Sequence, residues 1–182
     1  HCASVIKDGK RYNVTNAGLK GDTLLLGFSP ADFKAKVLVT RNEENINFKV
    51  TGVEGEAESF TFINIPLVLE GMTSEPFAAC ALSMNLFTHV RQLPALQTYL
   101  WASCYGRFGM QGAELTIVGV QQESVLPAIR NVMQNAPDVP FSDKGGAWAL
   151  LEKEGYGSYL MDFGSLTEKT VDETVRQCKK LG

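Results

Sequence analysis

The chain has 182 residues, of which 45% are hydrophobic and 20% are charged, with a formal net charge of −3 and a pI of about 5.4. This composition excludes a disordered chain, and the length provides for one domain, or for one domain and part of a second. No stretch is rich in Lys and Arg, so neither duplex nucleic acid nor an anionic membrane is an expected partner. No apolar run reaches the roughly 18–20 residues of a membrane span.

From residue 3 to about residue 118 the sequence has the pattern of strands. Asp8-Gly9 predicts a tight hairpin near the start of the chain. Two runs that alternate apolar and polar residues, 33–40 and 45–51, flank a polar turn and predict a second hairpin with one solvated face. Pro66 indicates an edge position or a bulge in its strand. Further strands are expected at 22–28, 60–69, 77–83, 87–93, 96–105 and 113–118.

These strands, with turns every 8–12 residues, predict a mainly β chain folded as an antiparallel β-sandwich of supersandwich type. The period then changes, and an apolar stripe that begins at Val125 predicts one helix near the end of the sandwich. Ser124 is the expected N-cap of this helix, and Ala136-Pro137 ends it. We therefore expect a sandwich domain at 1–136 and a connector at 137–156.

Residues 157–182 predict one strand followed directly by one amphipathic helix. Residues 158–163 have the composition of a strand, and Ser165 and Glu168 form a capping box, S-x-x-E. A parallel strand needs neighbours in its sheet, and the chain stops where the next strand would start. Our interpretation is that this C-terminal βα unit is the first strand and helix of a truncated α/β domain of the barrel type.

The cysteines and glycines give no sign of a metal or a cofactor. Cys2, Cys80, Cys104 and Cys178 lie far apart without metal-ligand spacing, so we expect free, mostly buried thiols and no zinc site. The glycines at 106–112 do not stand between a strand and a helix, as a dinucleotide-binding loop would. A nucleophilic pair of Cys104 and His89 would lack an orienting third group.

Aromatic and arginine side chains are the candidates for contact with a sugar. A flat ring with an apolar face suits a pyranose, and Arg can hold hydroxyl or carboxylate groups. Asp162 lies near the end of the expected barrel strand, where barrel enzymes gather their active-site groups. The expected substrate-binding residues are Trp101, Tyr105, Arg107, Trp148 and Asp162, with Tyr159 as a further aromatic candidate. Aromatic residues on alternating strand positions are also typical of a core, and that interpretation stays open.

Three acidic residues, Glu54, Glu56 and Glu58, alternate along the sequence and could line one face of a strand. A glycosidase needs two carboxyl groups that face each other across a cleft. We interpret the three glutamates as a solvated stripe and assign no catalytic residue to the chain.

Short phrases within residues 100–182 resemble one kind of protein. They are Arg107-Phe108-Gly109-Met110-Gln111-Gly112-Ala113, Ala136-Pro137-Asp138-Val139-Pro140, Gly145-Gly146-Ala147-Trp148 and Gly157-Ser158-Tyr159-Leu160-Met161-Asp162. Here the chain resembles the junction between an N-terminal β-sandwich and a catalytic barrel in large, secreted, glycosidase-like proteins of gut-type bacteria. The resemblance implies an oligosaccharide or polysaccharide ligand, a barrel in the same protein as partner, and a periplasmic, cell-surface or extracellular location. It also implies that the catalytic groups belong to later barrel strands.

Three hypotheses follow. The first is a non-catalytic N-terminal domain of a carbohydrate-active glycoside hydrolase, inactive alone, which packs on the barrel and shapes its substrate cleft. The second is a self-sufficient carbohydrate-binding or adhesion module. The third is an intracellular structural or regulatory β-domain, which the four free cysteines favour.

Overall fold

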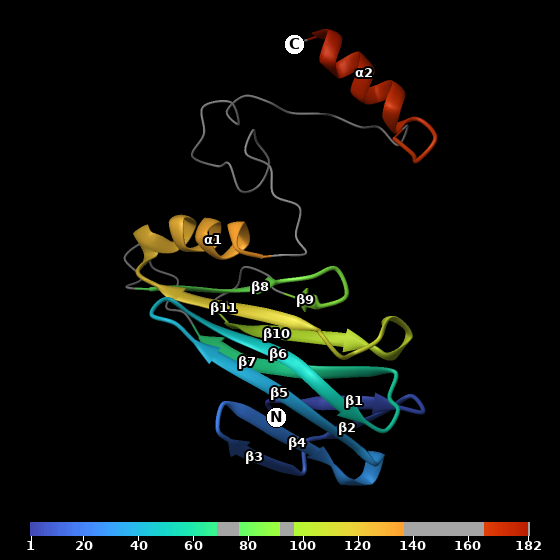
Figure 1. The fold of residues 1–182 in the computed structure, drawn as a ribbon, viewed down its shortest axis with the longest axis vertical. Helices are drawn as coiled ribbons and strands as arrows, with labels where there is room; N and C mark the ends of the chain where they lie inside the picture. The colour runs from blue at the N-terminus through green and yellow to red at the C-terminus, as the bar shows by residue number, and fades with distance from the viewer. Residues whose placement is uncertain (69–76, 92–96, 137–165, 182) are drawn as a thin grey trace. The chain divides into compact units, whose positions relative to one another are not determined.

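The structure is a computed structural model that describes residues 1–68, 77–91, 97–136 and 166–181. The chain divides into two compact units, His1–Phe141 and Ser142–Gly182. In the described part of the first unit, the strands form two antiparallel sheets (Figure 1). The predicted mainly β, antiparallel sandwich is confirmed.

One sheet has five strands in the order β2-β1-β7-β10-β9, and the other has six in the order β3-β4-β5-β6-β11-β8. The five-stranded sheet contains β1 (Ser4–Lys7), β2 (Lys10–Asn13), β7 (Ser59–Val68), β9 (His89–Arg91) and β10 (Gln97–Tyr105). The six-stranded sheet contains β3 (Asn16–Lys20), β4 (Thr23–Phe28), β5 (Phe33–Arg41), β6 (Asn45–Glu54), β8 (Ala78–Ser83) and β11 (Glu114–Val120). Of the nine pairings between the described strands, five join strands that are adjacent in the chain.

The two predicted hairpins are present. Asp8 and Gly9 join β1 to β2 with positive φ angles of 51° and 69°, as a turn that matches the twist of the strands requires. β5 and β6 pair along most of their length. Pro66 has the expected edge character on one side of β7: it pairs with Tyr99 of β10, but β1 pairs with β7 only at Ser59–Thr61, so no described strand pairs with the other side of β7 at Pro66. β3 was not predicted from the sequence, because its five residues are all exposed and so give no alternation of apolar and polar positions.

A group of phenylalanines joins the two sheets. Phe28 and Phe33 come from the six-stranded sheet, while Phe60 and Phe62 come from β7 in the five-stranded sheet. The ring centroids of Phe33 and Phe60 lie 5.5 Å apart, and those of Phe28 and Phe60 lie 5.8 Å apart. All four rings are almost fully buried, so they supply much of the apolar area that holds the layers together.

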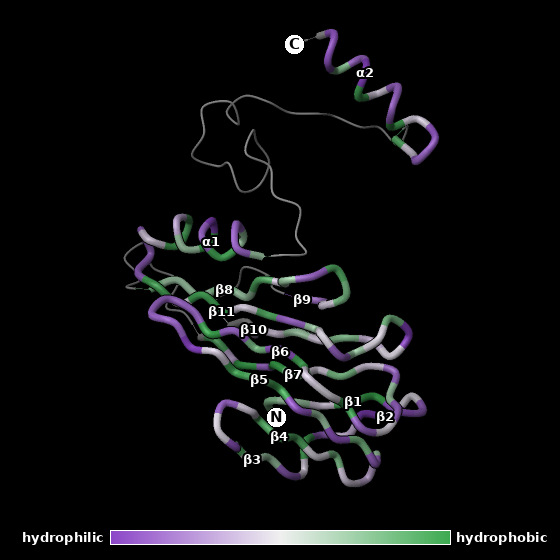
Figure 2. Tube along the Cα trace, viewed as in Figure 1, coloured by the Kyte–Doolittle hydropathy of each residue, from purple (hydrophilic) through white to green (hydrophobic). Residues whose placement is uncertain are grey.

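Helix α1 (Val125–Gln134) covers the outer face of β8 and β11 (Figure 1). Ala128 and Val132 pack there against Val118 of β11, which forms a second, smaller core. Hydrophobic and hydrophilic residues are interleaved along the strands, as Figure 2 shows. Ser124 is the N-cap residue of α1, as predicted, but it also ends a 3-10 turn (Gln122–Ser124) that runs into the helix, and its side chain makes no capping hydrogen bond.

In the second unit the structure describes a turn and helix α2 (Val171–Leu181). Its first turn carries Asp172 and Glu173 and its last turn Lys179 and Lys180, the arrangement that complements the helix dipole. The predicted C-terminal helix is therefore present. The expected strand at 158–163, the capping residue Ser165 and the connector at 137–156 lie outside the described residues. The barrel interpretation and the expected domain boundaries stay predictions.

The phenylalanine core gives a test of how the sheets are held together. We expect Phe60→Ala to lower the free energy of unfolding by about 3–5 kcal/mol, because it leaves a cavity at a fully buried site. Phe77→Ala removes a ring that is 41% exposed and should cost at most about 1 kcal/mol. Urea unfolding followed by circular dichroism measures both values. Equal losses for the two variants would contradict this account of the core.

Candidate functional site

Strand β10 displays a row of side chains on the outer face of the five-stranded sheet. Leu100, Ala102 and Cys104 are buried in the core between the sheets. Because side chains alternate along a strand, the residues between them point away from that core. The outward residues are Tyr99, Trp101, Ser103 and Tyr105. We call Tyr99, Trp101 and Tyr105, together with His89 of the neighbouring strand β9, the aromatic face.

His89 connects Trp101 and Tyr105, two of the three rings that β10 contributes to this face. Its ring meets Trp101 edge to face, with centroids 5.3 Å apart, and stacks on Tyr105 at 6.0 Å. Its Nδ1 also lies 2.9 Å from the Tyr105 hydroxyl, which is a hydrogen-bond distance. His89 is exposed, while Trp101 and Tyr105 are half-buried, so the rings support one another and still reach solvent.

Ser103 makes room for this arrangement. It stands opposite His89 in the register of β9 and β10, between Trp101 and Tyr105 along its own strand. The small side chain leaves space for the neighbouring rings. Ser103 is 1% exposed, and its hydroxyl has no hydrogen-bond partner among the described residues. Burial of an unpaired hydroxyl costs about 1–3 kcal/mol, which the packing of the rings must offset.

Arg107 extends the aromatic face beyond the end of β10. It lies in a 3-10 turn (Gly106–Phe108), with its guanidinium carbon 4.4 Å from the ring centroid of Phe108 and 5.9 Å from that of Tyr105. The turn sits tightly on the β6–β7 connection, because a Cβ at Gly106 would stand 2.4 Å from the carbonyl oxygen of Ala57. Glycine is therefore the residue that allows this close approach.

A surface depression of about 660 Å³ opens beside Tyr105 and Arg107. Asp8, Glu56 and Glu58 also line it. The Glu58 carboxylate accepts a hydrogen bond from the backbone N–H of Gly9 at 3.0 Å, so one acidic group already has a structural partner. The depression therefore combines an aromatic edge, a guanidinium and carboxylates, which are groups that bind hydroxyl-rich ligands.

The structure brings together three of the residues expected to bind substrate, namely Trp101, Tyr105 and Arg107. Trp148, Asp162 and the further candidate Tyr159 lie outside the described residues. Of the three glutamates expected to form a solvated stripe, only Glu54 belongs to a strand, while Glu56 and Glu58 lie in the β6–β7 connection.

Three residues near the site were not predicted from the sequence. Tyr99, which is 56% exposed, shares the face of Trp101 by simple alternation, and that signal was present in the sequence. His89 and Arg91 come from β9, whose pairing with β10 places them opposite Ser103 and Trp101. No local pattern reveals this register, since it depends on how two strands align.

Cys104 and His89 do not form a nucleophilic pair. Cys104 points into the core, where its thiol lies 3.6 Å from the carbonyl oxygen of Phe60, whereas His89 lies on the outer face. Burial raises the pKa of the Cys104 thiol to about 12, so it is protonated at neutral pH. The four cysteines are free thiols, as predicted. The expectation that most of them are buried is wrong, since Cys2 and Cys178 are exposed and Cys80 is half-buried.

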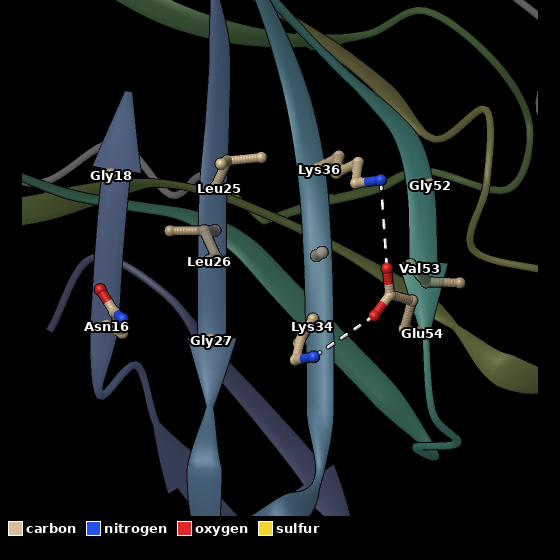
Figure 3. Close-up of a pocket in the computed structure, with 11 residues that line it drawn as sticks. Asn16, Gly18, Leu25, Leu26, Gly27, Lys34, Lys36, Gly52, Val53 and Glu54 are labelled. Carbon is tan, nitrogen blue, oxygen red and sulfur yellow. Dashed lines mark hydrogen bonds and ion pairs between the residues drawn. The ribbon is translucent and has the colours of Figure 1, made fainter. Parts of the chain in front are cut away.

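A second depression, of about 430 Å³, lies on the outer face of the six-stranded sheet (Figure 3). Gly18, Gly27 and Gly52 contribute no side chains there, which leaves a shallow hollow between strands. Lys34 and Lys36 reach Glu54 from the neighbouring strand, at 3.5 and 4.0 Å. The residues that line this hollow include no aromatic ring, and Glu54 offsets only one of the two lysine charges, so the hollow suits a sugar less than the aromatic face does.

The described residues contain no group of three or more His, Cys, Asp or Glu side chains placed to hold a metal ion. Within the same residues, no helix is long and apolar enough to cross a membrane.

Comparison with known proteins yields one weak similarity of structure. No protein-family model matches the sequence, and no curated protein does. The structure is weakly similar to a GH31 family sulfoquinovosidase from E. rectale, solved in complex with the aza-sugar inhibitor IFGSQ, with 9% sequence identity and a TM-score of 0.36. The match covers 72% of this chain and 30% of that enzyme, so the chain spans under a third of its length.

The placement of Cys104 predicts the pattern of thiol alkylation. At pH 8, iodoacetamide should modify Cys2 and Cys178 quickly and Cys104 only after unfolding, as mapped by mass spectrometry. Rapid alkylation of Cys104 in the folded chain would contradict its burial.

The raised pKa of Cys104 also makes the free energy of unfolding depend on pH. The stabilising contribution of this thiol is present in full below pH 9 and decreases as the pH rises toward 12.

The unpaired hydroxyl of Ser103 gives a second prediction. Ser103→Ala should raise the free energy of unfolding by about 1 kcal/mol, because it removes a buried polar group without removing a hydrogen bond. Ser83→Ala is the matched control, since the Ser83 hydroxyl lies 2.6 Å from the carbonyl oxygen of Asn85. It should lower the stability by about 1 kcal/mol. Urea unfolding compares them, and a clear loss in Ser103→Ala would show that its hydroxyl is bonded.

Proposed function

We propose that this chain is a non-catalytic β-sandwich domain of a carbohydrate-active glycoside hydrolase, and that its aromatic face contacts the glycan. The observation that carries the proposal is the clustering of Trp101, His89 and Tyr105 on the outer face of the five-stranded sheet, with Arg107 at one end. The resemblance of residues 100–182 to a sandwich–barrel junction supports the assignment to a hydrolase.

The chemistry of this face suits a sugar. A pyranose presents C–H groups on its faces and hydroxyl groups around its edge. An indole or phenol ring packs against the first, while polar side chains beside the ring bind the second. Both kinds of group are present here: the aromatic face supplies the rings, and the Arg107 guanidinium and the Glu56 carboxylate line the depression beside Tyr105.

The dimensions of the face suit a chain of several sugars. Tyr99 and Tyr105 stand at opposite ends of the outward row, separated by six residues of β10, or about 20 Å along the strand. A rigid strand holds these rings in place before a ligand arrives, which reduces the entropy lost on binding. In a complete hydrolase such a face would extend the substrate cleft and leave bond cleavage to the catalytic domain.

The test is glycan binding by the 182-residue chain and its variants. We expect affinity electrophoresis to show retardation by at least one member of a panel of neutral and acidic polysaccharides. Trp101→Ala should weaken this binding at least about tenfold, which titration calorimetry measures without relying on the indole itself.

Phe77→Ala is the control, since it removes an exposed ring that lies outside the aromatic face. It should bind as the unchanged chain does. Aryl glycosides should not be turned over by the chain alone. Absence of retardation by every glycan, or an equal loss in both variants, would contradict the proposed role of the aromatic face.

A further inference from the structure

The five-stranded sheet carries basic side chains and no acidic ones in its described strands. β1, β2, β7, β9 and β10 together contain Lys7, Lys10, Arg11, His89 and Arg91, but neither Asp nor Glu. The chain as a whole has a net charge of −3. The positive character is therefore a local property of this sheet.

Arg91 lies directly beside the largest ring of the aromatic face. It stands opposite Trp101 in the register of β9 and β10, on the same outer face. Its side chain is exposed and forms no ion pair with any residue that the structure describes. A free guanidinium presents five N–H donors in a planar fork that matches carboxylate and sulfate oxygens.

The nearby acidic groups lie at the other end of the row. Asp8, Glu56 and Glu58 line the depression beside Tyr105. Trp101 precedes Tyr105 by four residues, which is about 13 Å along the strand. This separation exceeds the Debye length of about 8 Å at physiological ionic strength, so these carboxylates only weakly offset the charge of Arg91.

We propose that the glycan bound at the aromatic face is anionic, with a sugar ring packed against Trp101 and a carboxylate or sulfate group held by Arg91. This inference rests on the proposed function and adds the chemical class of the ligand. Exposed aromatic rings would bind neutral glycans equally well, and the exposed guanidinium of Arg91 beside the indole is what favours a charged sugar. Carboxylate and sulfate share this chemistry, so the experiment distinguishes them.

The experiment compares dextran, dextran sulfate and polygalacturonate as ligands of the 182-residue chain. Dextran and dextran sulfate share one backbone, and polygalacturonate carries carboxylates instead of sulfates. We expect tighter binding to at least one anionic polymer than to dextran, and weaker binding to it as sodium chloride is raised. Arg91→Gln should weaken anionic binding about ten- to a hundredfold and leave dextran binding within twofold.

Two further variants make the result specific to the site. Arg41→Gln removes an exposed cation of the six-stranded sheet, at the end of β5. It should change neither the affinity for the anionic polymers nor the affinity for dextran. Arg91→Lys keeps the charge without the fork and should recover part of the loss. Circular dichroism confirms that each variant is folded.

The outcomes separate the two proposals. Binding of dextran that depends on Trp101 and equals the binding of both anionic polymers would overturn the inference and leave the proposed function intact. Binding of none of the three polymers, nor of any other glycan in the panel, would overturn the proposed function. Equal losses in Arg91→Gln and Arg41→Gln would show that polyanions bind through the overall charge, and would also overturn the inference.

Discussion

Burial of one side of β10 is the constraint on which the aromatic face depends. Leu100, Ala102 and Cys104 are held in the core, so alternation must place Trp101 and Tyr105 outside. A slip of one residue would exchange the two sets and bury the polar edges of the rings. Packing of the inward side chains in the core thus fixes Trp101 and Tyr105 on the outer face, although neither ring belongs to the core.

A β-bulge in the neighbouring strand β7 accommodates the alternation of side chains along β10. The register between β10 and β7 shifts between Ala102 and Ser103, so that Phe62 is an extra residue of β7. On one side of the shift Cys104 faces Phe60, and on the other Ala102 faces Ile63. All of these residues are buried. Phe60 and Phe62 share the inner face by alternation, and the bulge lets the adjacent Ile63 enter the core as well while β10 keeps strict alternation.

The strands could be predicted from the sequence where alternation or turn chemistry was strong, as at Asp8-Gly9 and along 33–51. β3 could not be, because it is an exposed edge strand whose residues follow no hydrophobic pattern. For the site, local residue type was enough to nominate Trp101 and Tyr105. It was not enough for His89 and Arg91, which join the site through the alignment of β9 with β10. Residue type placed Ser124 correctly at the N-cap of α1, but it could not show that the Ser124 side chain makes no capping hydrogen bond.

The placement of the aromatic face on a strand rather than on loops has a consequence for affinity. Loops position a site with less precision, and ordering them costs free energy on binding. Here Trp101 and Tyr105 are fixed by a central strand, since β10 pairs with both β7 and β9. β9 is a three-residue strand at the edge of the described sheet, so few backbone hydrogen bonds oppose its local opening. A ligand that contacts both β9 and β10 would therefore oppose the local opening of β9, because it would link β9 to a strand that is paired on both sides.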